Sequence, residues 1–375
     1  MGLIIFILQD FMSLMNTVMR KVVVIFLFIW FGIQDAYCQG FHINKGINIS
    51  HWLSQSKKRG ADRIQYFAET DVALIKSMGF DHLRLPVDEE QLWDSNGRKH
   101  PEAFELMHKF LGWAQKQNLR VIVDLHILRS HYFNSKKNDL WEKPEAQERF
   151  YQCWRELSEE LKPYPNSFLA YELMNEPVAP KADSWNQIAN NGLSIIRKKE
   201  PNRKVVIGSN MWQDPETFDQ LRIPAGDSNI ILSFHFYSPF ILTHYTAAWT
   251  PVALYKGKIQ YPGNLVDTIY LKTLPQNTQN EVANFSKYDN KEQLEKLLRK
   301  PLDLAHKMGL KLYCGEWGCY KDAPAESRLR WYKDVAQIFK ENNVDWTLWD
   351  YKGSFAVVEN GKINEALLDA VGLRK

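Results

Sequence analysis

Leu169–Pro177, which reads LAYELMNEP, is the most informative segment of this 375-residue chain. Its first five residues form a mostly apolar run of the length of a β-strand, and the strand is followed by a polar Asn-Glu pair before a proline. Such runs are expected of strands that are buried on both faces. Seven further segments have the same character: Gly46–Ile49, His82–Leu85, Val121–Leu125, Val205–Gly208, Ile230–Phe234, Leu312–Cys314 and Trp346–Trp349.

Amphipathic segments separate these apolar runs and predict helices. They are Glu69–Met78, Glu102–Gln117, Glu145–Leu161, Trp185–Lys199, Lys291–Met308 and Ser327–Asn342. Gly79 should close the first helix, and Pro301 should kink or divide the fifth. Eight strands in alternation with helices predict an α/β fold, a (β/α)8 TIM barrel that occupies residues 39–375 as one domain. An open doubly wound sheet is the alternative, but no glycine-rich phosphate loop follows the first strand.

Residues 1–38 have the features of an N-terminal extension and signal peptide. Met19-Arg20-Lys21 precedes the apolar run 22–33, and a small residue at Ala36 suits cleavage near Cys38. Met19 is therefore an alternative start, and the apolar run is too short for a comfortable membrane span. We expect a secreted or periplasmic protein with no membrane span after cleavage. Lipid anchoring at Cys38 and an uncleaved N-terminal anchor are the alternatives.

The composition excludes some partners and leaves others open. Charged residues make up 24% of the chain and give a net charge of +3, without a basic run that could follow nucleic acid. The mature chain would keep three cysteines, an odd number, and we expect free, mostly buried thiols. We also expect a monomer. Six tryptophans in loop-like surroundings could be core residues or platforms for sugar rings: Trp52, Trp93, Trp141, Trp185, Trp212 and Trp249.

Polar residues stand at the carboxyl ends of six predicted strands, where the active sites of barrels form. Arg84, His126, Glu176, His235, Glu316 and Asp350 are among them. Two carboxyl groups that face one glycosidic bond can hydrolyse it, one as acid and the other as an anion. Glu176 and Glu316 are such a pair. Arg84 could keep one glutamate ionised as the nucleophile, and the other would then have a raised pKa and act as the acid.

In this order along the chain, the residues resemble glycoside hydrolase family five, the large cellulase family of clan A. The resemblance extends over roughly residues 43–353 and implies that Glu176 of Asn-Glu-Pro is the acid/base and Glu316 of Gly-Glu the nucleophile. It implies substrate-binding roles for Arg84, His126, Asn175, His235, Tyr237 and Trp349, with Asn175 on the 2-hydroxyl and Trp349 as a platform. It implies no metal and no cofactor.

The resemblance implies a retaining β-glycosidase acting on a β-linked polysaccharide or oligosaccharide, with endo-β-1,4-glucanase placed first. Mannanase, xyloglucanase and exo-β-glucosidase remain rivals, because Trp317, Leu128-Arg129-Ser130 and the long segment 238–290 depart from the family pattern near the expected subsites. The long segment could close one end of a cleft or wall an open groove. Two other classes are a carbohydrate-binding pseudoenzyme and a metal-dependent hydrolase. The second would need clustered His and Asp at strand ends, and we expect His126 and His235 to stand apart without acidic companions.

Overall fold

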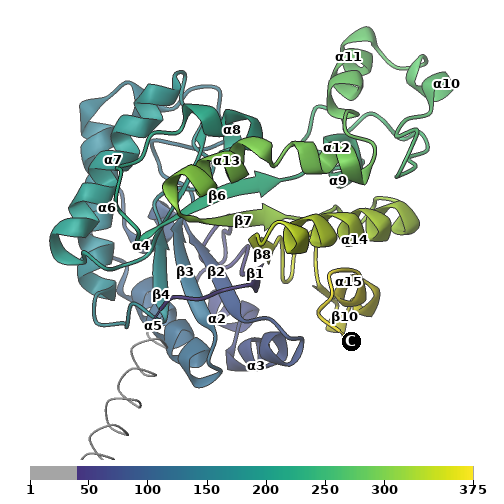
Figure 1. The fold of residues 1–375 in the computed structure, drawn as a ribbon. Coiled ribbons are helices and arrows are strands. Elements are labelled where there is room, and N and C mark those ends of the chain that lie inside the picture. Colours follow the sequence, from purple (N-terminus) through teal and green to yellow (C-terminus); the bar gives the residue numbers. More distant parts are fainter. Residues whose placement is uncertain (1–39, 375) are drawn as a thin grey trace, which may run out of the picture. The chain divides into compact units, whose positions relative to one another are not determined.

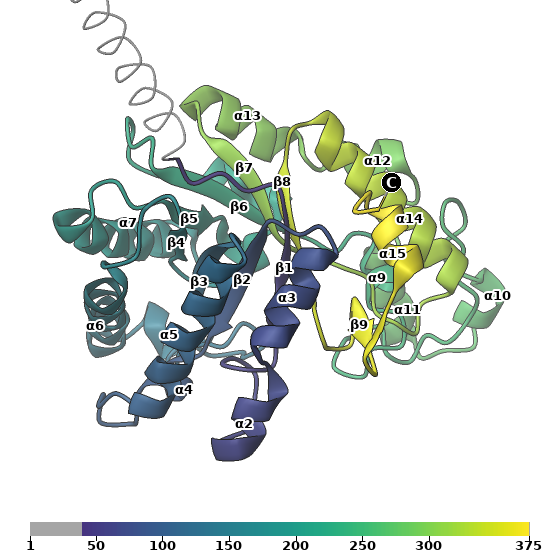
Figure 2. The ribbon, with the colours of Figure 1, turned by 90° about the horizontal axis from the view of Figure 1, so that it is seen from below.

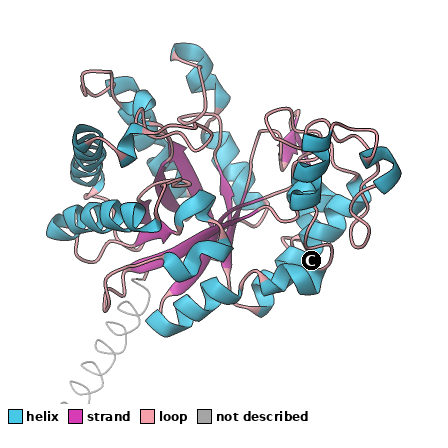
Figure 3. Ribbon diagram, turned by 90° about the horizontal axis from the view of Figure 1, so that it is seen from above, coloured by secondary structure: helices cyan, strands magenta, loops and turns pink. Residues whose placement is uncertain are grey.

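The structure, a computed structural model, describes residues 40–374, in which eight parallel strands close into a barrel in chain order (Figure 1). The strands are β1 (Lys45–Asn48), β2 (His82–Val87), β3 (Arg120–Leu125), β4 (Leu169–Glu172), β5 (Val205–Gly208), β6 (Ile230–Phe236), β7 (Lys311–Trp317) and β8 (Asp345–Leu348). All eight predicted strands are present, so the predicted (β/α)8 barrel is confirmed and the open sheet is wrong. The strands are buried almost throughout, because helices cover the outside of the barrel (Figure 3).

Helices α2 to α7 flank the strands of the first half of the barrel (Figure 2). The helices of the barrel and its loops are α2 (Gly60–Tyr66), α3 (Glu69–Ser77), α4 (Glu89–Leu92), α5 (Pro101–Lys116), α6 (Pro144–Leu161), α7 (Ala182–Lys199), α8 (Asn210–Gln213), α12 (Lys291–Lys296), α13 (Arg299–Met308), α14 (Ala325–Glu341) and α15 (Glu365–Ala370). Short 3-10 helices occupy Asp139–Trp141 and Pro215–Gln220. The predicted helices are all found, within a few residues at their ends.

The predicted helix Lys291–Met308 is divided, but not at its proline. α12 ends at Lys296 and α13 begins at Arg299, two residues before Pro301. A proline in the first turn of a helix is tolerated, because the first four N–H groups have no partner within the helix. Pro301 therefore lies in the first turn of α13 and does not kink the helix.

The long segment 238–290 is partly helical and lies beyond the carboxyl ends of β6 and β7 (Figure 1). It contains α9 (Phe240–Thr243), α10 (Thr268–Leu271) and α11 (Gln276–Phe285). At the same end of the barrel, the chain after β8 forms a hairpin of β9 (Val358–Glu359) and β10 (Lys362–Ile363). The hairpin turns at Asn360-Gly361, where both residues have positive φ, as a two-residue turn requires. These two additions frame the end of the barrel that carries the polar residues.

The structure also decides between the two predicted roles of the tryptophans. Trp52, Trp93 and Trp185 are buried in the core and Trp141 packs against it partly buried, whereas Trp212 and Trp249 are 43% and 55% exposed. Cys153, Cys314 and Cys319 are free and buried, as predicted. The predicted signal peptide, the start at Met19 and Cys38 lie outside the described residues. Among the helices of residues 40–374, none combines the length and hydropathy needed to cross a membrane.

Candidate active site

Arg84 lies at the centre of the site, on β2, and is fully buried. Its guanidinium donates to both carboxylate oxygens of Glu172, at 2.7 and 3.1 Å, and to Oε1 of Glu316 at 2.8 Å. Asp124 lies 3.0 Å from the same group. Burial alone would lower the pKa of Arg84, but the three carboxylates raise it well above its ordinary value. Arg84 is therefore a fixed cation that holds Glu316 through a charge-assisted hydrogen bond.

A β-bulge sets the position of Glu316 on β7. The ladder between β6 and β7 skips Gly315, so that the residue stands between two paired positions. A Cβ on Gly315 would approach the ring of His235 to 3.2 Å, which favours glycine there. Beyond the bulge, the carboxylate of Glu316 receives Arg84 on Oε1 and the hydroxyl of Tyr237 on Oε2, at 3.0 Å. Both partners donate, so both stabilise the ionised form.

Glu176 approaches from the other side, in the turn that follows β4. Its backbone is left-handed, with φ of 44°, a conformation that is uncommon for a residue with a Cβ and that persists where the surroundings enforce it. Its Oε1 lies 3.0 Å from Nδ1 of His235. One carboxylate oxygen of Glu176 lies within 4.8 Å of one of Glu316. Two carboxyl groups about 5 Å apart can act on the same carbon atom as acid and nucleophile.

The two carboxyl groups have unequal proton affinities. Burial, followed by the charge of Glu316, raises the pKa of Glu176 well above its usual range. Burial also raises the pKa of Glu316, but Arg84 and the Tyr237 hydroxyl oppose this effect. The neighbour of Glu176 gives no such help, because burial lowers the pKa of His235 far enough to keep its ring neutral. Glu176 therefore keeps its proton at a pH at which Glu316 is ionised.

The remaining predicted residues surround this pair. His126 bonds to Asp124 at 2.6 Å and lies parallel to the ring of Trp349, with centroids 5.8 Å apart. Burial lowers the pKa of His126 to about 3, so its ring is neutral. The side-chain oxygen of Asn175 accepts from Arg84 at 2.9 Å, while its buried Nδ2 has no partner within the described residues. That amide group is free to donate to a ligand hydroxyl, and the contacts bring all eight predicted residues together.

Four buried polar residues that the sequence analysis did not assign complete the network. Glu172 and Asp124 bind Arg84 as described above, and the side-chain oxygen of Asn48 accepts from the same guanidinium at 2.9 Å. Gln213 donates to Glu172 at 3.0 Å. Glu172 and Asp124 carried a signal in the sequence, because each is a charged residue within an otherwise apolar strand. Asn48 and Gln213 carried none.

A left-handed turn after β5 brings Trp212 close to the turn of Glu176. Met211, Trp212 and Gln213 have φ of 54°, 61° and 56°. The backbone N–H of Trp212 donates to the carbonyl of Pro177 at 3.2 Å, and its indole donates to the carbonyl of Phe133 at 3.0 Å. The turn thus places the buried side-chain amide of Gln213 next to the exposed indole of Trp212.

Three side chains of the site lie close enough together to be considered as metal ligands. One possible ligand atom from each of Glu176, His235 and Glu316 lies within 4.8 Å of the others. The chemistry of the group does not suit a divalent ion, because Arg84 lies 2.8 Å from Glu316 and already supplies its positive charge. A second cation beside this guanidinium would be repelled. The arrangement favours proton transfer between carboxyl groups over metal binding.

One expectation about this region is wrong. The histidines do have acidic companions: Asp124 bonds His126 at 2.6 Å, and Glu176 bonds His235 at 3.0 Å. In each pair the carboxyl group bonds Nδ1, so the Nε2 atoms are the ones left for other partners.

Two departures from the family pattern lie away from the catalytic pair. Trp317 is fully buried and packs on Trp346, with ring centroids 5.1 Å apart. Arg129 forms an ion pair with Glu89 at 3.0 Å and donates to a backbone carbonyl. Trp317 is therefore a core residue and Arg129 fixes a loop, so neither contact explains a choice of substrate.

Comparisons with known proteins agree with this geometry. The family model described as cellulase (glycosyl hydrolase family 5) matches residues 39–354. Endoglucanase C from Acetivibrio thermocellus is 33% identical over 82% of this chain and 90% of its own. Cellodextrinase A from Ruminococcus flavefaciens is 28% identical over 80% and 83%. The solved structure of endoglucanase Cel5A from Thermotoga maritima, 23% identical over 88% and 96%, has the same fold, with a TM-score of 0.71.

Proposed function

The chain belongs to the cellulase family, glycosyl hydrolase family 5, and is a glycoside hydrolase with a polysaccharide substrate; we propose that it is a retaining endo-β-1,4-glucanase in which Glu316 is the nucleophile and Glu176 the acid/base. The observation that carries the assignment of roles is the pair of carboxyl groups within 4.8 Å of each other, of which Glu316 alone contacts Arg84. The similarity to endoglucanase C supports the choice of substrate.

The proposed reaction has two displacements. Glu316 attacks the anomeric carbon, and the proton on Glu176 passes to the leaving oxygen as the glycosidic bond breaks. Glu176, now ionised, then takes a proton from the incoming water, whose oxygen displaces Glu316 and restores both groups. Asn175 is proposed to donate its free amide hydrogen to the 2-hydroxyl, and Trp349 to carry the sugar at the cleavage point. His126, His235 and Arg84 position these groups.

The test of the roles is chemical rescue. Glu316→Ala should lose nearly all hydrolysis of an aryl β-cellobioside and regain it with azide, giving a glycosyl azide of inverted configuration, because azide takes the place of the missing carboxylate. Wild-type activity in Glu316→Ala without azide would end the assignment. Glu176→Ala keeps the nucleophile, so azide should give a glycosyl azide of retained configuration with that variant. An inverted glycosyl azide from Glu176→Ala, with the retained product from Glu316→Ala, would exchange the two roles.

A second candidate is action on short cellodextrins, which the similarity to cellodextrinase A favours. Mannanase, xyloglucanase and exo-β-glucosidase activities remain open on the same barrel. Product analysis on soluble β-glucans, mannans, xyloglucan and cello-oligosaccharides separates these activities. We also propose that the protein is exported through the segment 1–38 and acts as a monomer; N-terminal sequencing of the mature protein and its mass in solution test these two points.

A further inference from the structure

Two aromatic residues that the proposed reaction does not use meet beside the barrel end. Trp249, from the inserted segment, is 55% exposed, and its ring meets that of the partly exposed Tyr320 edge to face, with centroids 5.3 Å apart. Tyr320 belongs to the loop after β7, and its backbone N–H donates to the carbonyl of Thr243 at 2.8 Å, which joins that loop to the insertion. An exposed indole beside a phenol is a surface on which the apolar face of a sugar can pack.

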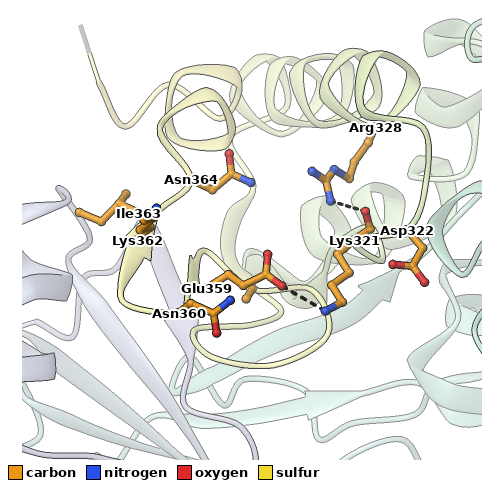
Figure 4. Close-up of a pocket in the computed structure, with 9 residues that line it drawn as sticks. Lys321, Asp322, Arg328, Glu359, Asn360, Lys362, Ile363 and Asn364 are labelled. Atoms are coloured by element: carbon orange, nitrogen blue, oxygen red, sulfur yellow. Dashed lines mark hydrogen bonds and ion pairs between the residues drawn. The ribbon is translucent and has the colours of Figure 1, made fainter.

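Lys321, which follows Tyr320 in the chain, lines a polar pocket of about 590 Å³ (Figure 4). Its volume is in the range of small-ligand sites. It lies between the loop after β7, the start of α14 and the β9–β10 hairpin, and its lining includes Lys321, Arg328, Glu359, Asn360 and Asn364. An apolar ligand would find few partners here, whereas a polyhydroxylated one would find many.

The polar groups of the pocket keep unused hydrogen-bonding capacity. Lys321 and Glu359 pair at 3.1 Å, but an ammonium has three donors and a carboxylate can accept several hydrogen bonds. Asn364 uses its oxygen to cap α15, accepting from a backbone N–H at 3.1 Å. Asn360 stands exposed at the corner of the hairpin. Amide, carboxylate and ammonium groups of this kind suit sugar hydroxyls.

Contacts connect this region to the reacting pair. The hydroxyl of Tyr237 bonds Glu316, and the ring of Tyr237 contacts that of Phe355, with centroids 6.0 Å apart. The ring of Phe355 in turn contacts that of Tyr320, with centroids 5.7 Å apart. The hairpin is fixed to the end of β8, because the N–H groups of residues 357 and 358 both donate to carbonyls at positions 350 and 351 at 3.0 Å. Those residues directly follow Trp349. The pocket therefore has a fixed position relative to the cleavage point.

The strand order gives the side of the substrate that would reach this pocket. Glu176 follows β4, and in a barrel closed in chain order β8 lies opposite β4 and β7 opposite β3. The acid protonates the leaving oxygen, so the leaving group lies on the side of Glu176. The loops after β7 and β8 then face the part of the chain that remains on the nucleophile, towards the non-reducing end.

We propose that Trp249, Tyr320 and the pocket around Lys321 and Asn360 form a distal sugar-binding subsite for the non-reducing part of a β-glucan chain. The proposal rests on the proposed function and adds to it a source of affinity for long substrates. The loops and the insertion that build the subsite lie outside the group of residues that perform the reaction.

The test uses the full-length enzyme with cellopentaose labelled at its reducing end and with an aryl β-cellobioside. Trp249→Ala removes the ring, and Asn360→Gly removes a side chain while keeping the left-handed turn. Each should lower kcat/KM for cellopentaose roughly threefold to tenfold, the loss expected from one contact, and leave the short cellobioside within about twofold. The labelled product should become longer, because complexes with many sugars on the non-reducing side are weakened. Ile269→Ala, which changes the most exposed large hydrophobic residue of the insertion, is the control.

Three results would overturn the subsite. Trp249→Ala and Asn360→Gly could both behave like Ile269→Ala on cellopentaose, or the labelled product could become shorter, which would place the contact on the leaving-group side. Equal losses on cellopentaose and the cellobioside would mean a general disturbance of the site. Failure of the proposed function has a different signature, since the wild type would then cleave neither substrate.

Discussion

Tyr237 offers the sharpest test of why Glu316, and not Glu176, is the ionised partner. Its hydroxyl donates to Oε2 of Glu316 at 3.0 Å, while Arg84 occupies Oε1. Tyr237→Phe removes one oxygen atom and leaves the ring in its contacts with His244 and Phe355. The change therefore removes one hydrogen-bond donor from the carboxylate of Glu316 with little change in packing.

The expected magnitude follows from the hydrogen bond. A hydrogen bond to a charged group contributes about 1.5–3 kcal/mol, and 1.36 kcal/mol corresponds to one pKa unit. Loss of the donor disfavours the ionised form, so the pKa of Glu316 should rise by about 1–2 units. Activity needs ionised Glu316, and on the acidic side of the profile it is proportional to the ionised fraction. Activity there should fall about tenfold to a hundredfold, and less on the plateau.

The measurement is the pH dependence of kcat/KM on a soluble cello-oligosaccharide. The acidic limb of Tyr237→Phe should move to higher pH, while the basic limb, set by Glu176, should move much less. Tyr261→Phe is a matched control, because it also removes a hydroxyl that donates to a carboxylate, that of Asp334 at 2.9 Å, outside the site. An acidic limb that stays in place in Tyr237→Phe, as it should in Tyr261→Phe, would refute the account of Glu316.

Three further variants test other parts of the site and the fold. Glu176→Gln should lower kcat/KM on cello-oligosaccharides by about 10²–10⁴, but far less on a dinitrophenyl cellobioside, whose leaving group departs without a proton; equal losses on both would contradict the acid role. Trp212→Ala should shorten the labelled product from cellopentaose. The backbone N–H of Trp212 donates to Pro177, the residue after Glu176, which places Trp212 on the leaving-group side; a longer product would contradict that placement. Asp88→Asn should become more stable relative to the wild type as the pH rises. Burial raises the pKa of Asp88 from 3.8 to about 7, so the folded protein binds this proton more tightly than the unfolded chain. The free energy of unfolding of the wild type should therefore fall by up to about 4 kcal/mol between about pH 4 and pH 7, and that of Asp88→Asn should not. Melting midpoints at pH 4.5 and pH 8 measure it, and a difference between the two proteins that does not change with pH would refute it.

The sequence was sufficient for the barrel because each strand is a short apolar run and six of the eight strand ends are polar. Segments such as Val205–Gly208 match the structure residue for residue. The insertion 238–290 was recognised by its length, but its helices α9 to α11 were not predicted, because two of them have only four residues each. Helices this short depend on tertiary contacts rather than on periodicity.

For the site, the sequence identified the polar residues at the ends of the predicted strands, although Arg84, His235 and Glu316 lie within the longer observed strands. It did not identify the acidic residues further inside the strands. Glu172 and Asp124 are buried on β4 and β3, and their role appears only when the closed barrel brings Arg84 between them. Gln213 reaches Glu172 through a left-handed turn that contains no glycine to mark it in the sequence. Contacts across a barrel depend on the strand register and on such turns, and neither can be read from one strand alone.

The acid/base assignment depends on the whole charge network rather than on the two glutamates alone. Arg84 is shared among Glu172, Asp124 and Glu316, so it compensates a group of carboxylates instead of neutralising one. Among the charges, Glu316 raises the pKa of Glu176 most, and the other two carboxylates raise it further against the opposing effect of Arg84. One more negative charge in this buried group is therefore costly, and the proton remains on Glu176, the carboxyl group without a charged partner. The two carboxylates that fix the arginine thus help to keep the acid protonated.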